Sequence, residues 1–246
     1  MRFTHYLFII LSLVITSSAL AEELPDDTNI NEQVQAFFKQ FEESEAAKTM
    51  TKEDWAAFEK DKAELAAKIP DPGLHVGDKA PDFKLKNAFG KDVSLSSMTK
   101  KGPVILVFYR GGWCGICNIQ LHSLNASLPT FKKYGAQLVA VTPQKPDRSQ
   151  EQIKKDGYPF EILSDLNYSV IKKYKLYFDL PEYMIALEKN KFGLDLADHN
   201  GKGRYGLPVP ATYIIDKKGI IRAAYANTDY TKRMEPKDIL AALKKL

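Results

Sequence analysis

A chain of 246 residues is long enough for one domain with a full hydrophobic core and a smaller appendage. Its formal net charge is +4, and the lysines are scattered along the sequence rather than grouped in a stripe. This distribution argues against nucleic acid or a membrane surface as a partner, because both require positive charge concentrated on one face.

Residues 1–21 have the pattern of a cleavable signal peptide. Arg2 gives a weakly positive start, residues 6–15 are almost wholly apolar, and Ala19-Leu20-Ala21 is a small-x-small cleavage site. An apolar core of about 10 residues is shorter than the ~20 that span a bilayer, although an uncleaved membrane anchor is the alternative. We expect a mature chain that starts near Glu22, with 34 basic and 31 acidic side chains, no lipid anchor and no membrane association, in the periplasm or outside the cell.

Residues 22–75 are predicted to form an acidic leader and a helical hairpin. Apolar residues recur at helical spacing within residues 29–47, and Thr51-Lys52-Glu53-Asp54 resembles a capping box that opens a second helix. Pro70-Asp71-Pro72-Gly73 breaks this second helix. The hairpin is either a dimerisation arm or a brace that packs against the rest of the chain, and we favour the brace.

From residue 76 to the C-terminus, short apolar runs alternate with amphipathic stretches, which predicts an α/β fold with a sheet flanked by helices on both faces. Expected strands cover residues 83–85, 93–95, 104–109, 138–141, 160–163, 211–216 and 220–225. Expected helices cover residues 115–133, 149–156, 167–174 and 235–244. Residues 176–205 are expected to form an irregular insertion. The aromatic residues Tyr174, Tyr177, Phe178 and Tyr183 either pack inside this region or line a substrate groove.

Cys114 and Cys117 are the only cysteines of the chain, and they follow the buried strand predicted over residues 104–109 and a glycine pair. This order places both sulfurs at the start of a helix, where unpaired N–H groups and the helix dipole favour the reactive thiolate. A disulfide between residues three apart closes a very small loop and stabilises the fold little. We therefore interpret the pair as redox-active rather than structural.

Five segments are similar to one known family: Val76-Gly-Asp-Lys-Ala-Pro-Asp-Phe83, Phe108-Tyr-Arg-Gly-Gly-Trp-Cys-Gly-Ile-Cys-Asn118, Leu138-Val-Ala-Val-Thr-Pro143, Leu207-Pro-Val-Pro-Ala-Thr-Tyr-Ile-Ile-Asp216 and Asp229-Tyr-Thr-Lys-Arg-Met-Glu-Pro236. Together they resemble the peroxiredoxin-like branch of the AhpC/TSA family. The resemblance implies a thioredoxin-like fold over residues 76–246 and a thiol-dependent oxidoreductase that needs no cofactor.

The chain departs from that family at three supporting positions. Peroxiredoxins attack hydroperoxides with a thiolate in a Pro-x-x-x-Thr-x-x-Cys motif, supported by a distant arginine. Aligned on Phe108, the attacking cysteine falls on Cys117, the threonine on Cys114 and the proline on Arg110, while the distant arginine falls on Pro210. We therefore expect dithiol–disulfide exchange with protein disulfides, hydroperoxides or both, and a dedicated hydroperoxide reductase is the alternative.

Four neighbours are predicted to support the sulfurs. Arg110 either supplies the positive charge that the missing arginine would give, or is a solvated arginine at a strand end. Trp113 is expected to pack beside the sulfurs and limit their contact with solvent. The Val209–Pro210 bond is predicted to be cis, as in thioredoxin-fold proteins, which would leave the backbone of Val209 free to pair with an extended substrate. The alternative is an ordinary proline before an edge strand.

The order of attack has two interpretations. In thioredoxin-like chemistry Cys114 attacks and Cys117 resolves, whereas the AhpC/TSA alignment implies the reverse. Helix geometry predicts that Cys114 is the more exposed and more acidic thiol, so we expect Cys114 to attack protein disulfides and Cys117 to attack hydroperoxides. An upstream thiol reductant, either a thioredoxin-like protein or a membrane electron donor, would regenerate the dithiol.

A copper-binding module is the alternative from a different functional class. The Sco family, which shares the thioredoxin fold, binds copper with two cysteines and a distant histidine. His199 would be the third ligand here, although Cys114 and Cys117 are one residue too close for that family's spacing. An exposed loop histidine is the simpler interpretation of His199, and the sequence contains no four-ligand zinc set.

Overall fold

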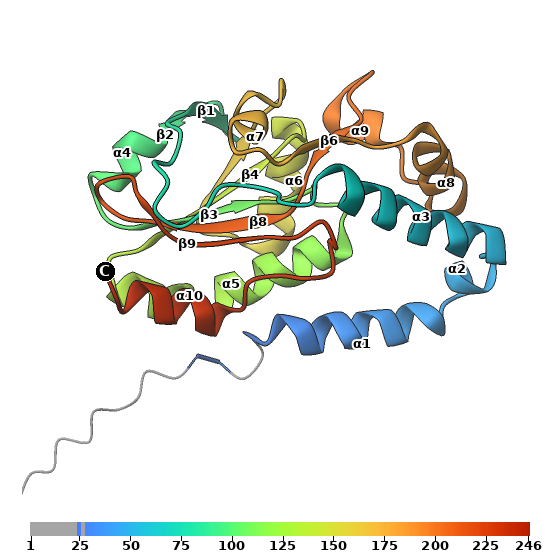
Figure 1. Cartoon of the computed structure of the whole chain (residues 1–246), viewed down its shortest axis with the longest axis horizontal. Coiled ribbons are helices and arrows are strands. Elements are labelled where there is room, and N and C mark those ends of the chain that lie inside the picture. Colours follow the sequence, from blue (N-terminus) through green and yellow to red (C-terminus); the bar gives the residue numbers. More distant parts are fainter. Residues whose placement is uncertain (1–23, 26–27) are drawn as a thin grey trace, which may run out of the picture.

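A mixed seven-stranded sheet forms the centre of the protein in a computed structural model that describes residues 24–25 and 28–246 (Figure 1). The strand order is β2-β1-β5-β4-β3-β8-β9. Strands β3, β4 and β5 are parallel, and all other pairs are antiparallel. The strands are β1 (Lys84–Asn87), β2 (Asp92–Ser94), β3 (Val104–Phe108), β4 (Gln137–Thr142), β5 (Glu161–Ser164), β8 (Ala211–Ile215) and β9 (Ile221–Ala226).

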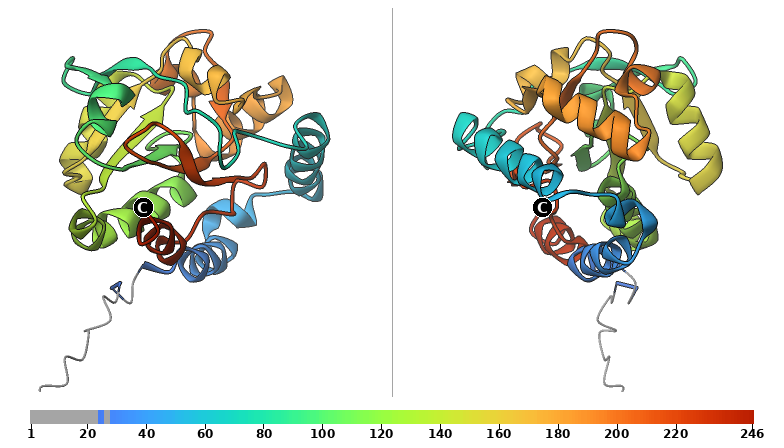
Figure 2. Two further views of the ribbon diagram at one scale, coloured as in Figure 1. Left: turned by 60° about the vertical axis from the view of Figure 1, so that its left-hand side comes forward. Right: turned by 90° about the vertical axis from the view of Figure 1, so that its right-hand side faces the viewer.

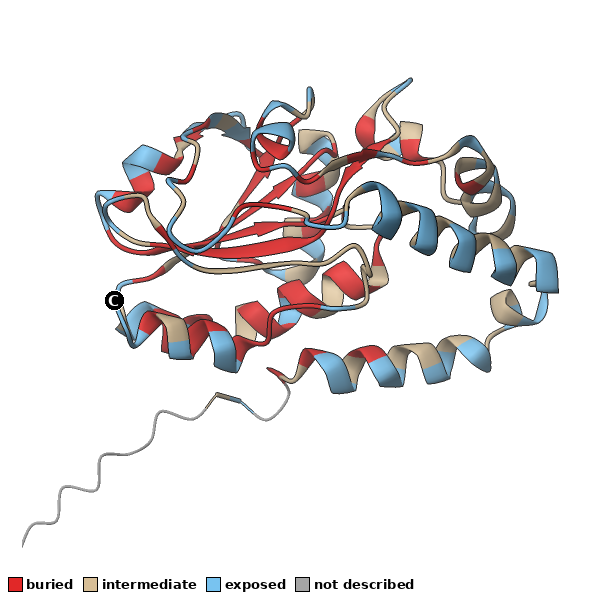
Figure 3. Ribbon diagram, in the orientation of Figure 1, coloured by how far each residue is buried: buried red, intermediate tan, exposed pale blue. Residues whose placement is uncertain are grey.

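Helices cover both faces of this sheet, as the sequence predicted. Helices α5 (Gly115–Lys133) and α10 (Pro236–Leu243) lie side by side on one face (Figure 1). The remaining helices of this part of the chain are α4 (Leu95–Thr99), α6 (Pro146–Asp156) and α7 (Ser169–Lys173). All five residues of β3 are buried, because neighbouring strands flank β3 on both edges and side chains cover both of its faces (Figure 3).

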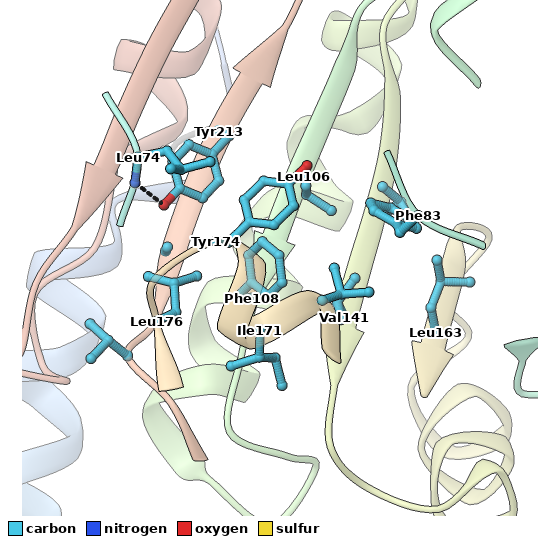
Figure 4. Packing of buried hydrophobic residues seen from close by; sticks show 14 of the residues in the cluster. Leu74, Phe83, Leu106, Phe108, Val141, Leu163, Ile171, Tyr174, Leu176 and Tyr213 are labelled. Carbon is cyan, nitrogen blue, oxygen red and sulfur yellow. Dashed lines mark hydrogen bonds between the residues drawn. The ribbon is translucent and has the colours of Figure 1, made fainter. Parts of the chain in front are cut away.

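Strand alternation divides the core into two clusters. Ile105 and Val107 point towards α5 and α10, whereas Leu106 and Phe108 point to the opposite face. On that opposite face the rings of Phe108 and Tyr174 lie 4.9 Å apart (Figure 4). The hydroxyl of Tyr213 accepts a hydrogen bond of 3.1 Å from the backbone N–H of Leu74 (Figure 4), which fixes the segment before β1 to the sheet.

The N-terminal region is helical, but it does not close into a simple hairpin. It contains α1 (Ile30–Glu42), the short α2 (Glu45–Lys48) and α3 (Lys52–Lys68), so the first predicted helix ends earlier than expected. Helix α1 packs against α5, whereas α3 packs against α8 (Glu182–Phe192), and the two helices therefore lie apart (Figures 1 and 2). We call α1 to α3 the arm.

Local signals define where the helices of the arm begin. The predicted capping box is present at α3, where Thr51 and Asp54 each accept a hydrogen bond from the other's backbone N–H. The carboxylate of Glu235 accepts hydrogen bonds of 2.9 Å from the N–H groups of Ile30 and Asn31, which anchors the first turn of α1 beside α10. The arm is therefore held at both ends by the rest of the chain, as expected for a brace.

The expected irregular insertion is folded instead. It contains β6 (Tyr177–Asp179), α8 and α9 (Leu196–Asn200), and β6 pairs with β7 (Gly206–Pro208) in a second, two-stranded sheet. Tyr174 and Phe178 are buried in the core, and Tyr177 and Tyr183 pack against it, while Phe178 also lines a cavity.

The structure tests neither the predicted signal peptide nor the predicted domain boundary. The signal peptide at residues 1–21 lies outside the described residues, and the domain boundary between residues 75 and 76 stays a prediction. Within the described residues, none of the helices combines the length and the apolar character needed to cross a membrane.

Candidate active site

The two cysteines lie where β3 passes into α5. Cys114 is the N-cap residue of α5, and its sulfur accepts a hydrogen bond of 3.4 Å from the backbone N–H of Cys117. Both side chains are buried, with 4% of Cys114 and none of Cys117 exposed, and both thiols are free. The sequence correctly placed both sulfurs at the start of a helix.

A buried polar network holds the loop that precedes the cysteines. The backbone N–H of Gly112 donates a hydrogen bond of 2.9 Å to the side chain of Gln144. The side-chain amide of Asn118 donates to the carbonyl of Gly112 at 2.8 Å. Because the loop is bonded on both sides of Gly112, the position of Cys114 relative to the sheet is fixed before any substrate binds.

Arg233 is the residue of the site that the sequence analysis missed. Its Nη2 donates to the sulfur of Cys117 at 3.6 Å, and its Nε donates to the side chain of Gln120 at 2.9 Å. Gln120 is itself bonded to the hydroxyl of Thr212 at 3.1 Å. The segment with Arg233 matched the family motif Asp229 to Pro236, which was the available signal, but the alignment assigned the supporting arginine to Pro210.

The charges around the pair separate the pKa values of the two thiols. Burial alone raises the pKa of Cys117, but the hydrogen bond from Cys114 and the charges of Arg233 and Arg110 outweigh burial and lower it to about 5. Burial and the adjacent Cys117 raise the pKa of Cys114. The expectation that Cys114 is the more acidic thiol is therefore wrong, because Cys117 accepts the hydrogen bond between the two sulfurs and also contacts the guanidinium of Arg233.

Arg110 is buried beside the sulfurs and is not a solvated arginine. Its guanidinium lies over the rings of Trp113 and Tyr230, at 4.9 and 4.5 Å from their centroids. Its Nη2 is 3.9 Å from a carboxylate oxygen of Glu188 on α8. The positive charge of Arg110 acts on both thiols, so the predicted supporting residue is present in the site.

The predicted cis-proline is not found. No cis peptide bond occurs within residues 24–25 and 28–246, so the Val209–Pro210 bond is trans. The backbone N–H of Val209 donates to the carbonyl of Leu176 at 2.7 Å and is not free to pair with a substrate. This prediction fails because the β6–β7 sheet, which the sequence did not reveal, brings Leu176 next to Val209.

Comparison with known proteins identifies the family. The sequence profile of the AhpC/TSA family matches residues 76–224, more than half of the chain. This chain belongs to the AhpC/TSA family. Chloroplastic peroxiredoxin Q of Populus jackii is 31% identical over 154 residues, which cover 63% of this chain and 61% of that protein. The putative peroxiredoxin bcp of Helicobacter pylori is 28% identical over 154 residues, which cover 63% of this chain and 89% of that protein.

The same fold occurs in solved structures. Peroxidoxin BcpB from Mycobacterium tuberculosis superposes with a TM-score of 0.56 and 18% identity, over 70% of this chain and 98% of that chain. The predicted thioredoxin-like fold is therefore confirmed. The chain spans about three fifths of the length of the plant relatives it matches, and the arm precedes the part that matches the AhpC/TSA profile.

A cavity of about 550 Å³ opens above the cysteines of this AhpC/TSA protein. Cys114, Gly115, Arg110 and Pro210 belong to its lining, together with Trp113, whereas Cys117 does not. The aromatic ring of Trp113 lies against the backbone of Gly111, where an added Cβ would be 2.4 Å from Nε1. Trp113 is partly buried and packs against the cluster of buried residues that contains both cysteines. Molecules that enter the cavity meet Cys114 before Cys117.

The copper alternative is not supported. No group of three His, Cys, Asp or Glu side chains within the described part of the chain could hold a metal ion. His199 instead lies 6.5 Å from the ring of Trp113, measured between centroids, and its carbonyl accepts a hydrogen bond from Lys145. The geometry therefore does not bring His199 together with Cys114 and Cys117 as a ligand set.

Proposed function

We propose that this AhpC/TSA protein is a thiol-dependent peroxidase in which the thiolate of Cys117 attacks the hydroperoxide. The contact of Arg233 with Cys117 supports this assignment, because a thiol with a pKa of about 5 is ionised at neutral pH. The peroxiredoxin relatives support the reaction class.

The reaction proceeds in four steps. The Cys117 thiolate takes the terminal oxygen of ROOH, the O–O bond breaks, and Cys117 becomes a sulfenic acid while RO⁻ leaves. RO⁻ takes the proton of the Cys114 thiol and departs as the alcohol. The Cys114 thiolate then attacks the sulfur of Cys117, which forms the disulfide and releases hydroxide. An external dithiol restores both cysteines and is itself oxidised to a disulfide.

The positive charges have a defined role in this scheme. Arg233 stabilises the Cys117 thiolate before it attacks the peroxide. It also lies beside the sulfur from which negative charge passes to the leaving oxygen during the attack. Arg110 lies on the cavity side, where negative charge develops on the leaving oxygen. In this scheme the two arginines take over the electrostatic support that the threonine and the distant arginine give in the family motif.

Disulfide exchange remains a second candidate because Cys114 lines the cavity. A thiol that attacks the Cys114 sulfur of the disulfide expels the Cys117 thiolate, and a thiol of low pKa leaves readily. A thioredoxin-like protein or a membrane electron donor would reach the pair by this route. The same reaction in reverse would reduce a protein disulfide.

Trapping the first oxidised sulfur tests the peroxidase. Reduced Cys114→Ser and Cys117→Ser proteins are treated with hydrogen peroxide and then with a sulfenate-specific reagent, and the site of modification is found by mass spectrometry. We expect sulfenate at Cys117 in Cys114→Ser and no peroxide consumption by Cys117→Ser. Sulfenate at Cys114, with full consumption by Cys117→Ser, would contradict the assignment.

We further propose that the chain is exported through residues 1–21. The pattern of an apolar core followed by Ala19-Leu20-Ala21 supports this location. N-terminal sequencing of the protein recovered from a periplasmic extract should begin near Glu22. Recovery of the intact N-terminus from the cytoplasm alone would contradict export.

A further inference from the structure

Arg110 and Glu188 form an ion pair at the edge of the active site. The Nη2 of Arg110 is 3.9 Å from a carboxylate oxygen of Glu188, and only 13% of each side chain is exposed. Within the described residues, Arg110 makes no other ion pair, and its Nε has no hydrogen-bond partner. Because an arginine keeps its charge in proteins, Glu188 is the group that offsets this buried charge.

The position of Glu188 is determined by parts of the chain outside the cysteine loop. Glu188 lies on α8, which belongs to the insertion, and α8 packs against α3 of the arm (Figure 1). The Nζ of Lys191 on α8 is 2.7 Å from the carboxylate of Asp54 on α3, and both side chains are largely buried. The arm and the insertion therefore hold the carboxylate of Glu188 at the guanidinium of Arg110.

The other charged groups of the cavity are farther from Arg110 or are paired elsewhere. Lys62 lies 3.9 Å from Glu59 and 3.8 Å from Asp229, so these two carboxylates offset its charge. Asp61 also lines the cavity but makes no ion pair with Arg110. Burial raises the pKa of Asp61, and the charge of Arg110 only partly opposes this increase. The carboxylate on α8 is therefore the closest one to the arginine.

The two buried arginines of the site act mainly on different sulfurs. Arg233 contacts Cys117 and, within the described residues, forms no ion pair with a carboxylate. Arg110 lines the cavity together with Cys114, whereas Cys117 does not line it. Burial and the adjacent Cys117 raise the pKa of Cys114, and Arg110 opposes this increase more strongly than Arg233 does. The arginine beside Cys117 is thus uncompensated, and the arginine beside Cys114 is compensated.

This difference matters because the proposed reaction needs a protonated Cys114. The alkoxide that leaves the hydroperoxide takes the proton of the Cys114 thiol, and an ionised Cys114 would have no proton to give. Without a counter-charge, Arg110 would favour the thiolate of Cys114 and so remove the proton donor. A carboxylate beside Arg110 weakens this effect.

We propose that Glu188 is a positioning residue that acts through Arg110 and keeps Cys114 protonated until the hydroperoxide has reacted. This inference rests on the proposed peroxidase function and assigns a residue outside the cysteine loop to its proton transfer. Glu188 offsets the charge of Arg110, while Arg233 remains free to stabilise the Cys117 thiolate. One thiol of the pair is therefore ionised while the other still carries the proton that the leaving alkoxide takes.

Alkylation of Cys114 with iodoacetamide, which is uncharged, measures this effect. The rate is followed against pH in the full-length Cys117→Ser protein, where the thiolate of Cys114 is the reacting group and the profile gives its pKa. Glu188→Gln removes the carboxylate charge, Glu188→Asp retains it, and Arg110→Met removes the group through which Glu188 acts. Glu182→Gln is the matched control, because Glu182 is exposed on the same helix and lies outside the cavity.

We expect Glu188→Gln to lower the pKa of Cys114 by about one unit, which corresponds to about tenfold more thiolate at pH 7. Glu188→Asp should recover part of this change, and Glu182→Gln should leave the pKa as in the parent. In the Arg110→Met background, Glu188→Gln should change the pKa much less, because burial then raises the pKa of Glu188 without opposition from the arginine and the carboxyl group takes up a proton.

The intact cysteine pair provides a second measurement. The kcat/KM for hydrogen peroxide should decrease at alkaline pH as Cys114 loses its proton. In Glu188→Gln this decrease should begin about one pH unit lower than in the parent, whereas Glu182→Gln should keep the profile of the parent.

Four results would overturn the inference. A Cys114 pKa that is unchanged in Glu188→Gln, with peroxide consumption intact in the parent, would reject Glu188 and leave the peroxidase function standing. An equal decrease in the Arg110→Met background would reject the route through Arg110. A lower pKa without a shifted peroxide profile would show that Cys114 is not the proton donor. A parent protein that consumes no hydroperoxide at any pH would reject the peroxidase function itself, and this role of Glu188 with it.

Discussion

Arg233 lies 3.6 Å from the Cys117 sulfur and is itself only 4% exposed, so water screens its charge little. Replacement of Arg233 by Met removes this charge and leaves a buried thiol whose burial penalty is no longer offset. The pKa of Cys117 should rise by roughly one to three units. The thiolate absorbance near 240 nm, followed against pH in the Cys114→Ser background, measures this pKa.

Two other arginines serve as comparisons for this prediction. Arg110→Met should raise the pKa of Cys117 less, because the charge of Arg110 is shared with Cys114 and Glu188. Arg222→Met should leave it unchanged, because Arg222 is 44% exposed and pairs with Asp216. A Cys117 pKa that is the same in Arg233→Met and in the parent would contradict the role of Arg233.

The depressed pKa of Cys117 also predicts how stability depends on pH. Between pH 5 and about 8.5, the folded state carries a Cys117 thiolate while the unfolded chain still holds the proton. Because the unfolded state binds more protons, the free energy of unfolding should rise with pH across this window and be lost as pH falls through 5. The raised pKa of Cys114 changes the free energy of unfolding only at higher pH, where the unfolded chain would lose the Cys114 proton.

Urea unfolding of the reduced parent and of Cys117→Ser, measured at several pH values, checks this expectation. The difference in unfolding free energy between the two proteins should grow by up to about 4 kcal/mol from pH 5 to pH 8.5, because each unit of difference between the folded and unfolded pKa contributes at most about 1.4 kcal/mol. A difference that does not change with pH would contradict an ionised Cys117 in the folded protein.

The sequence predicted which neighbouring residues form the site, but it did not predict the contacts they make with residues distant in the chain. Cys114, Cys117, Trp113 and Arg110 are adjacent in the chain, so their proximity follows from local geometry. Arg233 lies 116 residues from Cys117, and only the packing of the β9–α10 connection brings the two together. The isomer of the Val209–Pro210 bond likewise depends on tertiary contacts that no local pattern encodes.

At the scale of the elements, α1 and α5 come into contact where Phe37 of α1 lies against Gly115 of α5. A Cβ placed on Gly115 would lie 2.8 Å from the ring of Phe37, so the ring must move or α1 must shift away from α5. Gly115→Ala should therefore loosen α1 and speed proteolysis within the arm, even though alanine favours helix over glycine by about 1 kcal/mol. Limited proteolysis followed by mass spectrometry locates the cleavage.

A double mutant tests the cause of this effect. In Phe37→Ala/Gly115→Ala the clash is absent, so the second substitution should add little to the protease sensitivity of Phe37→Ala alone. Additive effects of the two substitutions would show that Gly115 acts through the helix start rather than through Phe37.

Helix α8 was not predicted from the sequence because its apolar residues give no periodic signal. In α8 the apolar residues Tyr183, Met184, Ile185 and Leu187 are nearly consecutive, so they form no single face and give no clear helical period. The helix is instead delimited by Pro181 before it and by Gly193, with φ of +65°, after it. These start and stop signals are in the sequence, but they are weaker than a periodic apolar stripe.

At the scale of the whole molecule, the alternation of strands and helices was enough to predict the mixed sheet and its covering layers. The cavity was not predictable, because its walls come from the arm, the insertion and the start of α5, which are distant in sequence. The spacing of apolar residues indicated that the arm is helical. It did not indicate that α1 and α3 contact different parts of the protein.

The contact between Arg233 and Cys117 also affects the reduction potential of the cysteine pair. The positive charge of Arg233 stabilises the thiolate of the reduced pair and has no thiolate to stabilise in the disulfide, so it favours the reduced state and raises the potential. Equilibration with a dithiothreitol or glutathione buffer should therefore give a potential that falls by some tens of millivolts in Arg233→Met, and an unchanged potential would contradict this. The arginine that prepares Cys117 for oxidation thus also makes the disulfide easier to reduce, which favours its return to the dithiol.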